Sequence, residues 1–139
     1  MPRYDQTAEQ IEAETDRLLL EQAQAFIRDM RAAAQNAPYG KVIQRADAFA
    51  VQNGREFARN VLETIIQEQN DLLEKKETRQ CTCGGDRKHL GYAAKAIVSV
   101  SGEFQTNRIY RRCAQCGITI YPTDEMLGLE ERYTVGLRD

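Results

Sequence analysis

The sequence predicts an α+β protein in which an antiparallel hairpin or bundle of long helices precedes a small β-hairpin ribbon. Three observations lead to this prediction. Apolar residues recur at steps of three and four over the first half of the chain, which is typical of amphipathic helices. The period changes to two between residues 94 and 112, which is typical of strands. All four cysteines stand in two tight pairs that flank this second pattern.

The first helix is expected over residues 7–36. It begins at Thr7-Ala8-Glu9-Gln10, which has the form of a capping box, and it ends at the Pro38 and Gly40 break. A heptad-like seam runs along it through Leu19, Ala23, Phe26, Met30, Ala33 and Ala37, and a second column adds Leu20, Ile27 and Ala34. Such a helix would be about 45 Å long. The seam is buried either within one antiparallel hairpin or partly against a second copy of the chain.

Two further helices are expected over residues 41–52 and 55–77. Between them stands Asn53-Gly54, which we interpret as a helix C-cap or a kink because the flanking residues have helical spacing. The predicted third helix ends in the charged run Glu74 to Arg79. Residues 1–78 are therefore assigned to a helical domain that dimerises or binds a helical protein partner.

Residues 79–139 are assigned to a ribbon domain. Strands are expected over residues 94–100 and 103–112, with Ser101-Gly102 as the turn between them. A third short strand over residues 118–121 is ended by Pro122, and a short helical turn and a tail follow.

The cysteine pairs predict a metal site made of Cys81, Cys83, Cys113 and Cys116. The pairs read Cys81-Thr82-Cys83-Gly84-Gly85 and Cys113-Ala114-Gln115-Cys116-Gly117, and about thirty residues separate them, enough for a β-hairpin to bring them together. A glycine after each pair allows a positive φ, so that backbone amides can point at the sulfurs. Four thiolates in this arrangement are typical of structural zinc. Zinc would supply about 10–16 kcal/mol of folding energy to a segment with few large apolar side chains.

Other uses of these cysteines are less consistent with the spacing. A Cys-x-Cys disulfide would be strained, and redox pairs usually open a helix, whereas Cys116-Gly117-Ile118 leads into a strand. An iron–sulfur cluster also takes four cysteines, but two glycine-flanked pairs bridged by a hairpin fit zinc better. His89, the only histidine, is not needed as a ligand. Four protein ligands leave no open position for catalysis.

Basic charge is concentrated around the predicted ribbon. The chain has a net charge of −2, yet residues 79–113 contain seven Lys or Arg against two acidic residues. A basic strip with an interleaved aromatic side chain is suited to phosphate contact and base stacking. The expected nucleic-acid contacts are Arg87, Lys88, Lys95, Arg108, Tyr110, Arg111 and Arg112. The alternative is that these cations offset the negative charge of a four-thiolate zinc site, or form a protein interface.

Residues 79–138 resemble the N-terminal region of ISKra-type bacterial insertion-sequence transposases. The resemblance includes both cysteine pairs, Gly91-Tyr92, Arg108-Ile-Tyr-Arg-Arg-Cys113 and Tyr121-Pro-Thr-Asp-Glu125, followed by Leu127-Gly-Leu129. In that family, helices and a zinc-ribbon-like region precede an RNase H-like catalytic domain, which would begin near Tyr133. The resemblance implies a transposase-derived chain that binds transposon-end or regulatory DNA without cutting it, and no catalytic role passes to Asp124, Glu125, Glu130 or Glu131.

These observations lead to one expected function and one alternative. We expect a non-catalytic, cytoplasmic zinc-ribbon protein that binds DNA. The alternative is an assembly module that dimerises or regulates a full-length transposase or another nucleic-acid enzyme. A hydrolase is not expected, because the chain has no nucleophile-elbow or phosphate-loop motif. No apolar run is long enough to span a membrane, and no small-molecule substrate is indicated.

Overall fold

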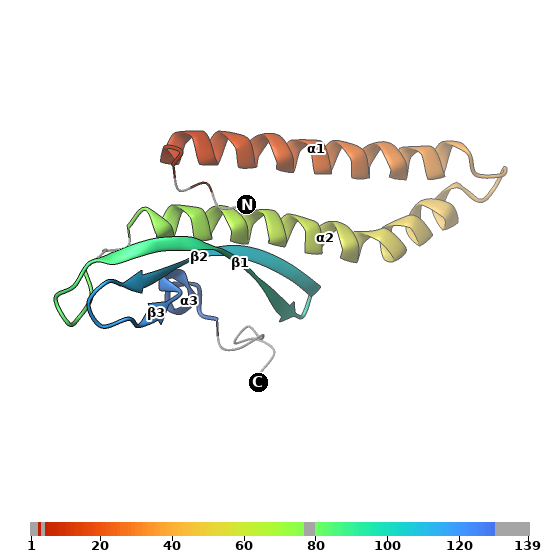
Figure 1. Cartoon of the computed structure of the whole chain (residues 1–139). Helices are drawn as coiled ribbons and strands as arrows, with labels where there is room; N and C mark the ends of the chain where they lie inside the picture. Colours follow the sequence, from red (N-terminus) through yellow and green to blue (C-terminus); the bar gives the residue numbers. More distant parts are fainter. Residues whose placement is uncertain (1–2, 4, 77–79, 130–139) are drawn as a thin grey trace.

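The computed structural model describes residues 3, 5–76 and 80–129. Two long antiparallel helices, α1 (Ala8–Gln35) and α2 (Val42–Glu74), lie side by side, and α2 separates α1 from a small sheet (Figure 1). The sheet contains β1 (Arg87–Ser99), β2 (Gly102–Cys113) and β3 (Thr119–Ile120), and a short helix α3 (Pro122–Leu127) contacts both α2 and β2. The predicted α+β class and the order of helices before ribbon are confirmed.

The start of α1 is fixed by the predicted capping box. The Thr7 hydroxyl accepts a hydrogen bond from the Gln10 amide at 3.1 Å, and the Thr7 amide donates to the Gln10 side chain at 2.9 Å. Two amides that lack partners inside the helix are satisfied in this way. The helix ends at Asn36, and Gly40 in the following loop has a φ of 82°. The expected first helix is therefore confirmed to within one residue at each end.

The predicted break at Asn53-Gly54 is wrong as a helix end, because α2 runs without interruption through it. Phe49 and Phe57 lie on either side of Gly54, and both rings contact Phe26 of α1, with centroids 5.5 and 4.5 Å away. A glycine within a helix costs about 1 kcal/mol relative to alanine. Packing of two aromatic rings on a common partner offsets a cost of that size. The predicted end of this helix beyond residue 76 lies outside the described residues.

The sheet is antiparallel with the order β1-β2-β3. Its first strand begins at Arg87, earlier than the predicted residue 94, and a bulge between His89 and Gly91 shifts its register. The turn at Gly102 has a φ of 123°, and β3 pairs with the end of β2, where Arg111 faces Ile120. The strand pattern, the turn, the third short strand and the short helix after it are confirmed, and residues 130–139 of the predicted tail lie outside the described part.

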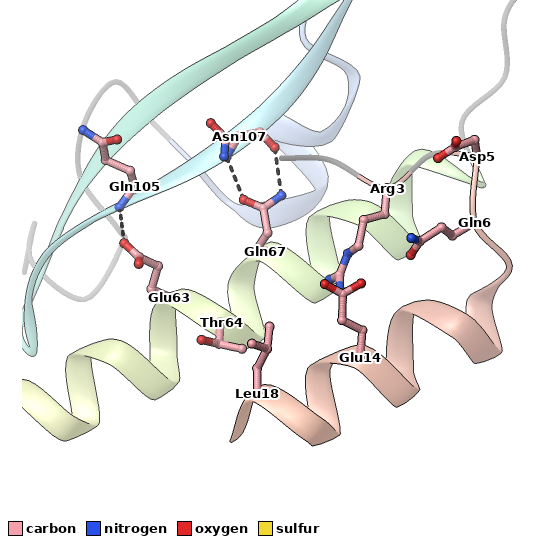
Figure 2. Close-up of a pocket in the computed structure, with 10 residues that line it drawn as sticks. All are labelled: Arg3, Asp5, Gln6, Glu14, Leu18, Glu63, Thr64, Gln67, Gln105 and Asn107. Carbon is pink, nitrogen blue, oxygen red and sulfur yellow. Dashed lines mark hydrogen bonds and ion pairs between the residues drawn. The ribbon is translucent and has the colours of Figure 1, made fainter. Parts of the chain in front are cut away.

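A row of polar side chains on α2 covers the edge of β2 that β3 leaves unpaired. We call Arg59, Glu63, Gln67 and Asn70 the polar ladder. Arg59 donates to the Glu103 carbonyl (3.2 Å), Glu63 accepts from the Gln105 amide (2.9 Å), Gln67 bonds both the amide and the carbonyl of Asn107 (2.8 and 3.0 Å), and Asn70 donates to the same carbonyl (3.0 Å). Figure 2 shows Glu63 and Gln67 reaching the strand across a polar groove of about 630 Å³.

The spacing of residues along a helix and along a strand explains why the polar ladder reaches successive backbone groups of β2. Four residues of helix advance about 6 Å, and two residues of strand advance about 6.7 Å. Side chains four residues apart on α2 therefore lie opposite every second residue of β2. These are the residues whose backbone N–H and C=O groups point away from β1 toward α2. An open strand edge is otherwise a site of unwanted pairing with other chains.

The most enclosed part of the molecule is the junction of the helices with β2 and α3. Among the described residues, the buried apolar side chains other than two cysteines are Ile11, Ile97, Phe104 and Ile109. At the junction, the fully buried Asp71 bonds Arg3 (2.9 Å) and Asn70 (3.1 Å), and Thr123 of α3 donates to Asn70 at 2.6 Å. Burial raises the pKa of Asp71, although Arg3, Gln67 and Asn70 oppose the shift. Elements that are far apart in the sequence are thus joined by one polar network.

The rest of the helical hairpin is more open. No side chain between residues 16 and 69 is fully enclosed, and the second predicted seam column is exposed at Leu20 (59%) and Ile27 (53%). The seam is therefore only partly covered within one chain. The two predicted regions, 1–78 and 79–139, contact each other through α2, β2 and α3. Among the described residues, no helix combines the length and apolarity needed to cross a membrane.

Candidate metal centre

The first cysteine pair forms a tight turn that leads into β1. The Cys81 amide donates to the Gly85 carbonyl at 2.8 Å, and the Gly84 amide donates to the Cys81 carbonyl at 2.9 Å. Gly84 has a φ of 93°, a conformation that side chains with a Cβ rarely adopt. The predicted need for glycine after this pair is confirmed.

The second cysteine pair follows β2 in a matching turn. The Gly117 amide donates to the Cys113 carbonyl at 3.0 Å, the Cys113 amide donates to the Ile118 carbonyl at 3.0 Å, and Gly117 has a φ of 76°. The two turns are tied together, because the Ala114 amide donates to the Asp86 carbonyl at 3.0 Å. Both turns lie at the same end of the sheet (Figure 1).

The four cysteine sulfurs meet between these turns. All four lie within 4.8 Å of one another, with 3.7 Å between Cys81 and Cys116 and 3.5 Å between Cys83 and Cys113. A tetrahedral zinc with Zn–S bonds of about 2.3 Å separates its sulfurs by about 3.8 Å, whereas a disulfide joins them at about 2.05 Å. The cysteines are not disulfide-bonded. The arrangement can hold one metal ion, and it is the single such cluster among residues that the structure describes.

The electrostatics of the cluster favour a cation. The Cys83 amide lowers the pKa of the Cys81 thiol to about 6, and the Cys116 amide lowers the pKa of Cys113. For Cys83, the Gly85 amide lowers the pKa, but the neighbouring sulfurs of Cys113 and Cys81 outweigh it and raise the pKa to about 11. The raised pKa of Cys83 reflects the closeness of its sulfur neighbours, and a divalent cation between the sulfurs would favour their ionised form.

The absence of a side chain at Gly85 leaves space for the second cysteine turn beside the first. A Cβ at this position would lie 2.7 Å from the Cys113 sulfur, 2.7 Å from the Gln115 Cβ and 3.4 Å from the Cys83 sulfur. From the sequence, the glycines that follow the pairs are expected to matter through their φ angles. The steric role of Gly85 is not visible in the sequence, since Gly85 does not have a positive φ and only the approach of the second turn creates the need.

The predicted nucleic-acid contacts separate into two groups. In the first group, Arg108 is buried, forms a 2.6 Å ion pair with Asp124, and lies over the Tyr121 ring at 4.0 Å. Lys95 lies 3.8 Å from the same carboxylate, and Tyr110 contacts the Tyr121 ring at 5.8 Å between centroids. Arg111 is also buried, on the stretch of β2 between β1 and β3. Arg108, Lys95 and Tyr110 thus link the sheet to Tyr121 and α3, and Arg111 lies inside the fold.

The second group lies at the end of the sheet beside the two cysteine turns, which we call the metal end. Lys88 and Arg112 are exposed and stand directly opposite each other on β1 and β2, while Arg87 stands opposite Cys113. Lys88 and Arg112 also line a groove of about 370 Å³ with Leu90 and the second cysteine turn. Like charges directly opposite each other in a sheet are destabilising. The pairing of these two cations therefore does not itself stabilise the sheet.

Tyr121 and Asp124 were missed as partners of Arg108. No sequence signal linked them, because the contact depends on how α3 folds back against β2. His89, which we did not expect to be a ligand, packs its ring edge-on against Tyr92 at 5.2 Å.

Comparison of the chain with family models, with curated proteins and with solved structures gives no match. The resemblance to transposase N-terminal regions accordingly stays a prediction, as does any relation to a catalytic domain.

Proposed function

We propose that this chain is a non-catalytic, zinc-stabilised protein that binds DNA at the metal end of its sheet. The observation on which this proposal rests is the cluster of four sulfurs within 4.8 Å, with an exposed like-charge pair of cations beside it.

Zinc is the metal that this ligand set suits best. Four thiolates from two tight turns prefer a tetrahedral, soft-ligand ion, and sulfur separations of 3.5 and 3.7 Å are close to the tetrahedral value. With four protein ligands, such an ion has no open position for a substrate or a catalytic water. A structural role for the metal follows from that ligand count.

DNA binding is supported by the placement of Lys88 and Arg112. Both are exposed, both line the groove beside the second cysteine turn, and nothing in their pairing benefits the sheet. Phosphate groups would relieve the repulsion between them. The resemblance to transposases supports DNA as the nucleic acid, and it suggests transposon-end or regulatory sequences as the target.

The same cations would also offset the two net negative charges of zinc with four thiolates, and one experiment distinguishes these roles. A Lys88→Gln/Arg112→Gln variant is compared with wild type on a short DNA duplex at salt concentrations between about 50 and 200 mM. The control is Lys41→Gln/Arg45→Gln, which removes the same charge from two exposed residues near the tip of the helical hairpin.

If the proposal is correct, the first variant binds DNA more weakly than the control, and its plot of log affinity against log salt is shallower by about 2. Zinc affinity is measured on the same samples. The DNA-binding proposal is rejected if wild type does not bind at low salt, if both variants lose affinity equally, or if the first variant loses only zinc affinity.

A further inference from the structure

The helical hairpin leaves several apolar side chains exposed on one side. Exposed apolar residues recur at steps of seven on both helices, with Leu20 and Ile27 on α1 and Val51, Ala58 and Ile65 on α2. Their exposed fractions are 59% and 53% for the first two, and 72% and 37% for Val51 and Ile65. We call these five residues the apolar face.

The five residues lie at matching levels of the hairpin. Gln22 bonds Thr64 at 2.9 Å, and Phe26 stacks on Phe57 with centroids 4.5 Å apart, which fixes the register of the two antiparallel helices. In this register Leu20 is level with Ile65, and Ile27 is level with Ala58. Val51 continues the surface toward the tip of the hairpin.

The apolar face lies on the side of the hairpin away from the sheet. Residues on a helix are about 100° apart, so Leu20 and Ile27 project about 180° from Leu18, which lines the groove beside β2. On α2, the apolar residues likewise project away from Glu63 and Gln67, which bond β2. The sheet therefore does not cover this surface.

We propose that the apolar face packs against the same face of a second copy, in an antiparallel, two-fold symmetric four-helix bundle. A second copy would add burial that one chain lacks, because no side chain from residue 16 to residue 69 is fully buried. Isolated helices depend on tertiary packing of their apolar faces for most of their stability.

The charge distribution selects the antiparallel orientation. Residues 8–21, at the end near the sheet, contain five carboxylates and one arginine, whereas residues 28–47, around the tip, contain four basic and two acidic residues. A two-fold axis across the hairpins places the acidic end of each copy against the basic tip of the other. A parallel arrangement would place like charges together.

The exposed side of the hairpin is also about large enough for a stable dimer interface. A helix of 28 residues is about 42 Å long, and two helices side by side are about 18 Å wide, which gives about 750 Å² per copy. Stable protein interfaces bury about 800 Å² per partner.

The experiment measures the mass of the zinc-loaded chain in solution by sedimentation equilibrium at tens of micromolar. We expect twice the 15.8 kDa of one chain. A Leu20→Gln/Ile27→Gln variant should sediment as one copy. The control, Ala32→Gln, places a glutamine at an exposed position on another side of α1 without changing a charge, and it should keep the wild-type mass.

Circular dichroism accompanies each measurement, because the inference requires that the monomeric variant remain helical. Ile65→Gln on α2 provides a second test with the same expected loss of self-association. A wild-type mass of one copy overturns the proposal, even if the chain then binds some other protein, and so does a control variant that dissociates as fully as the test variant. The measurement contains no nucleic acid, so its outcome is independent of the proposed DNA binding.

Discussion

Gly85 illustrates how closely the second cysteine turn approaches the first. Its hydrogen atoms occupy the space between Cys113, Gln115 and Cys83, and a methyl group there would lie 2.7 Å from a ligand sulfur. We predict that Gly85→Ala lowers zinc affinity by about 10- to 100-fold, the range seen when groups that support metal ligands are changed. Competition with a chromophoric chelator measures this affinity.

Gly54→Ala is the control for that prediction. Gly54 lies inside α2, and a Cβ added to it meets nothing within 4 Å. This variant should keep the wild-type zinc affinity while stabilising the helix by about 1 kcal/mol in a denaturant titration. Equal zinc affinity in the Gly85→Ala and Gly54→Ala variants would contradict the steric role of Gly85.

Residue types alone predicted the cysteine cluster better than they predicted the surroundings of the basic residues. The cysteine spacing identified Cys81, Cys83, Cys113 and Cys116, and the structure brings all four together. The basic residues of β2 looked equivalent in sequence, yet Arg108 is buried against Asp124 while Arg112 is exposed. The difference is set by α3, whose position no local pattern revealed.

Among the elements, α2 has two roles on two of its sides. One side contacts α1 through aromatic rings, and another satisfies the open edge of β2 through the polar ladder. The sequence suggested two helices that meet at Asn53-Gly54. It did not reveal the contacts with β2, because an edge strand creates the need for polar side chains only after the sheet has formed.

The ladder leads to a prediction about stability. Gln67→Met keeps the shape of the side chain but leaves the amide and carbonyl of Asn107 without this partner, and we expect a loss of about 2 kcal/mol in the free energy of unfolding. Gln69→Met is the control, because Gln69 is exposed on the same helix and bonds only the neighbouring Glu68 among the described residues. Similar unfolding midpoints for the two variants would show that the ladder contributes little.

At the scale of the whole molecule, the enclosed core and the metal centre stabilise different parts of the sheet. Ile97, Phe104 and Ile109 are buried on β1 and β2, whereas the far end of the sheet, with both cysteine turns and β3, has exposed Leu90 and Ile118 instead of a core of its own. We expect a metal ion bound by the four sulfurs to stabilise that end. The helices, which do not contact the metal, should form without it.

The most direct test of this account is a metal analysis combined with backbone amide exchange on the same reduced, folded protein, before and after a strong chelator. We predict one zinc ion per chain. After its removal, the amides of the two cysteine turns and of β3 should lose protection while those of α1 and α2 stay protected. Folded protein without any metal, or a metal-free protein in which the cysteine turns remain as protected as before, would contradict the account.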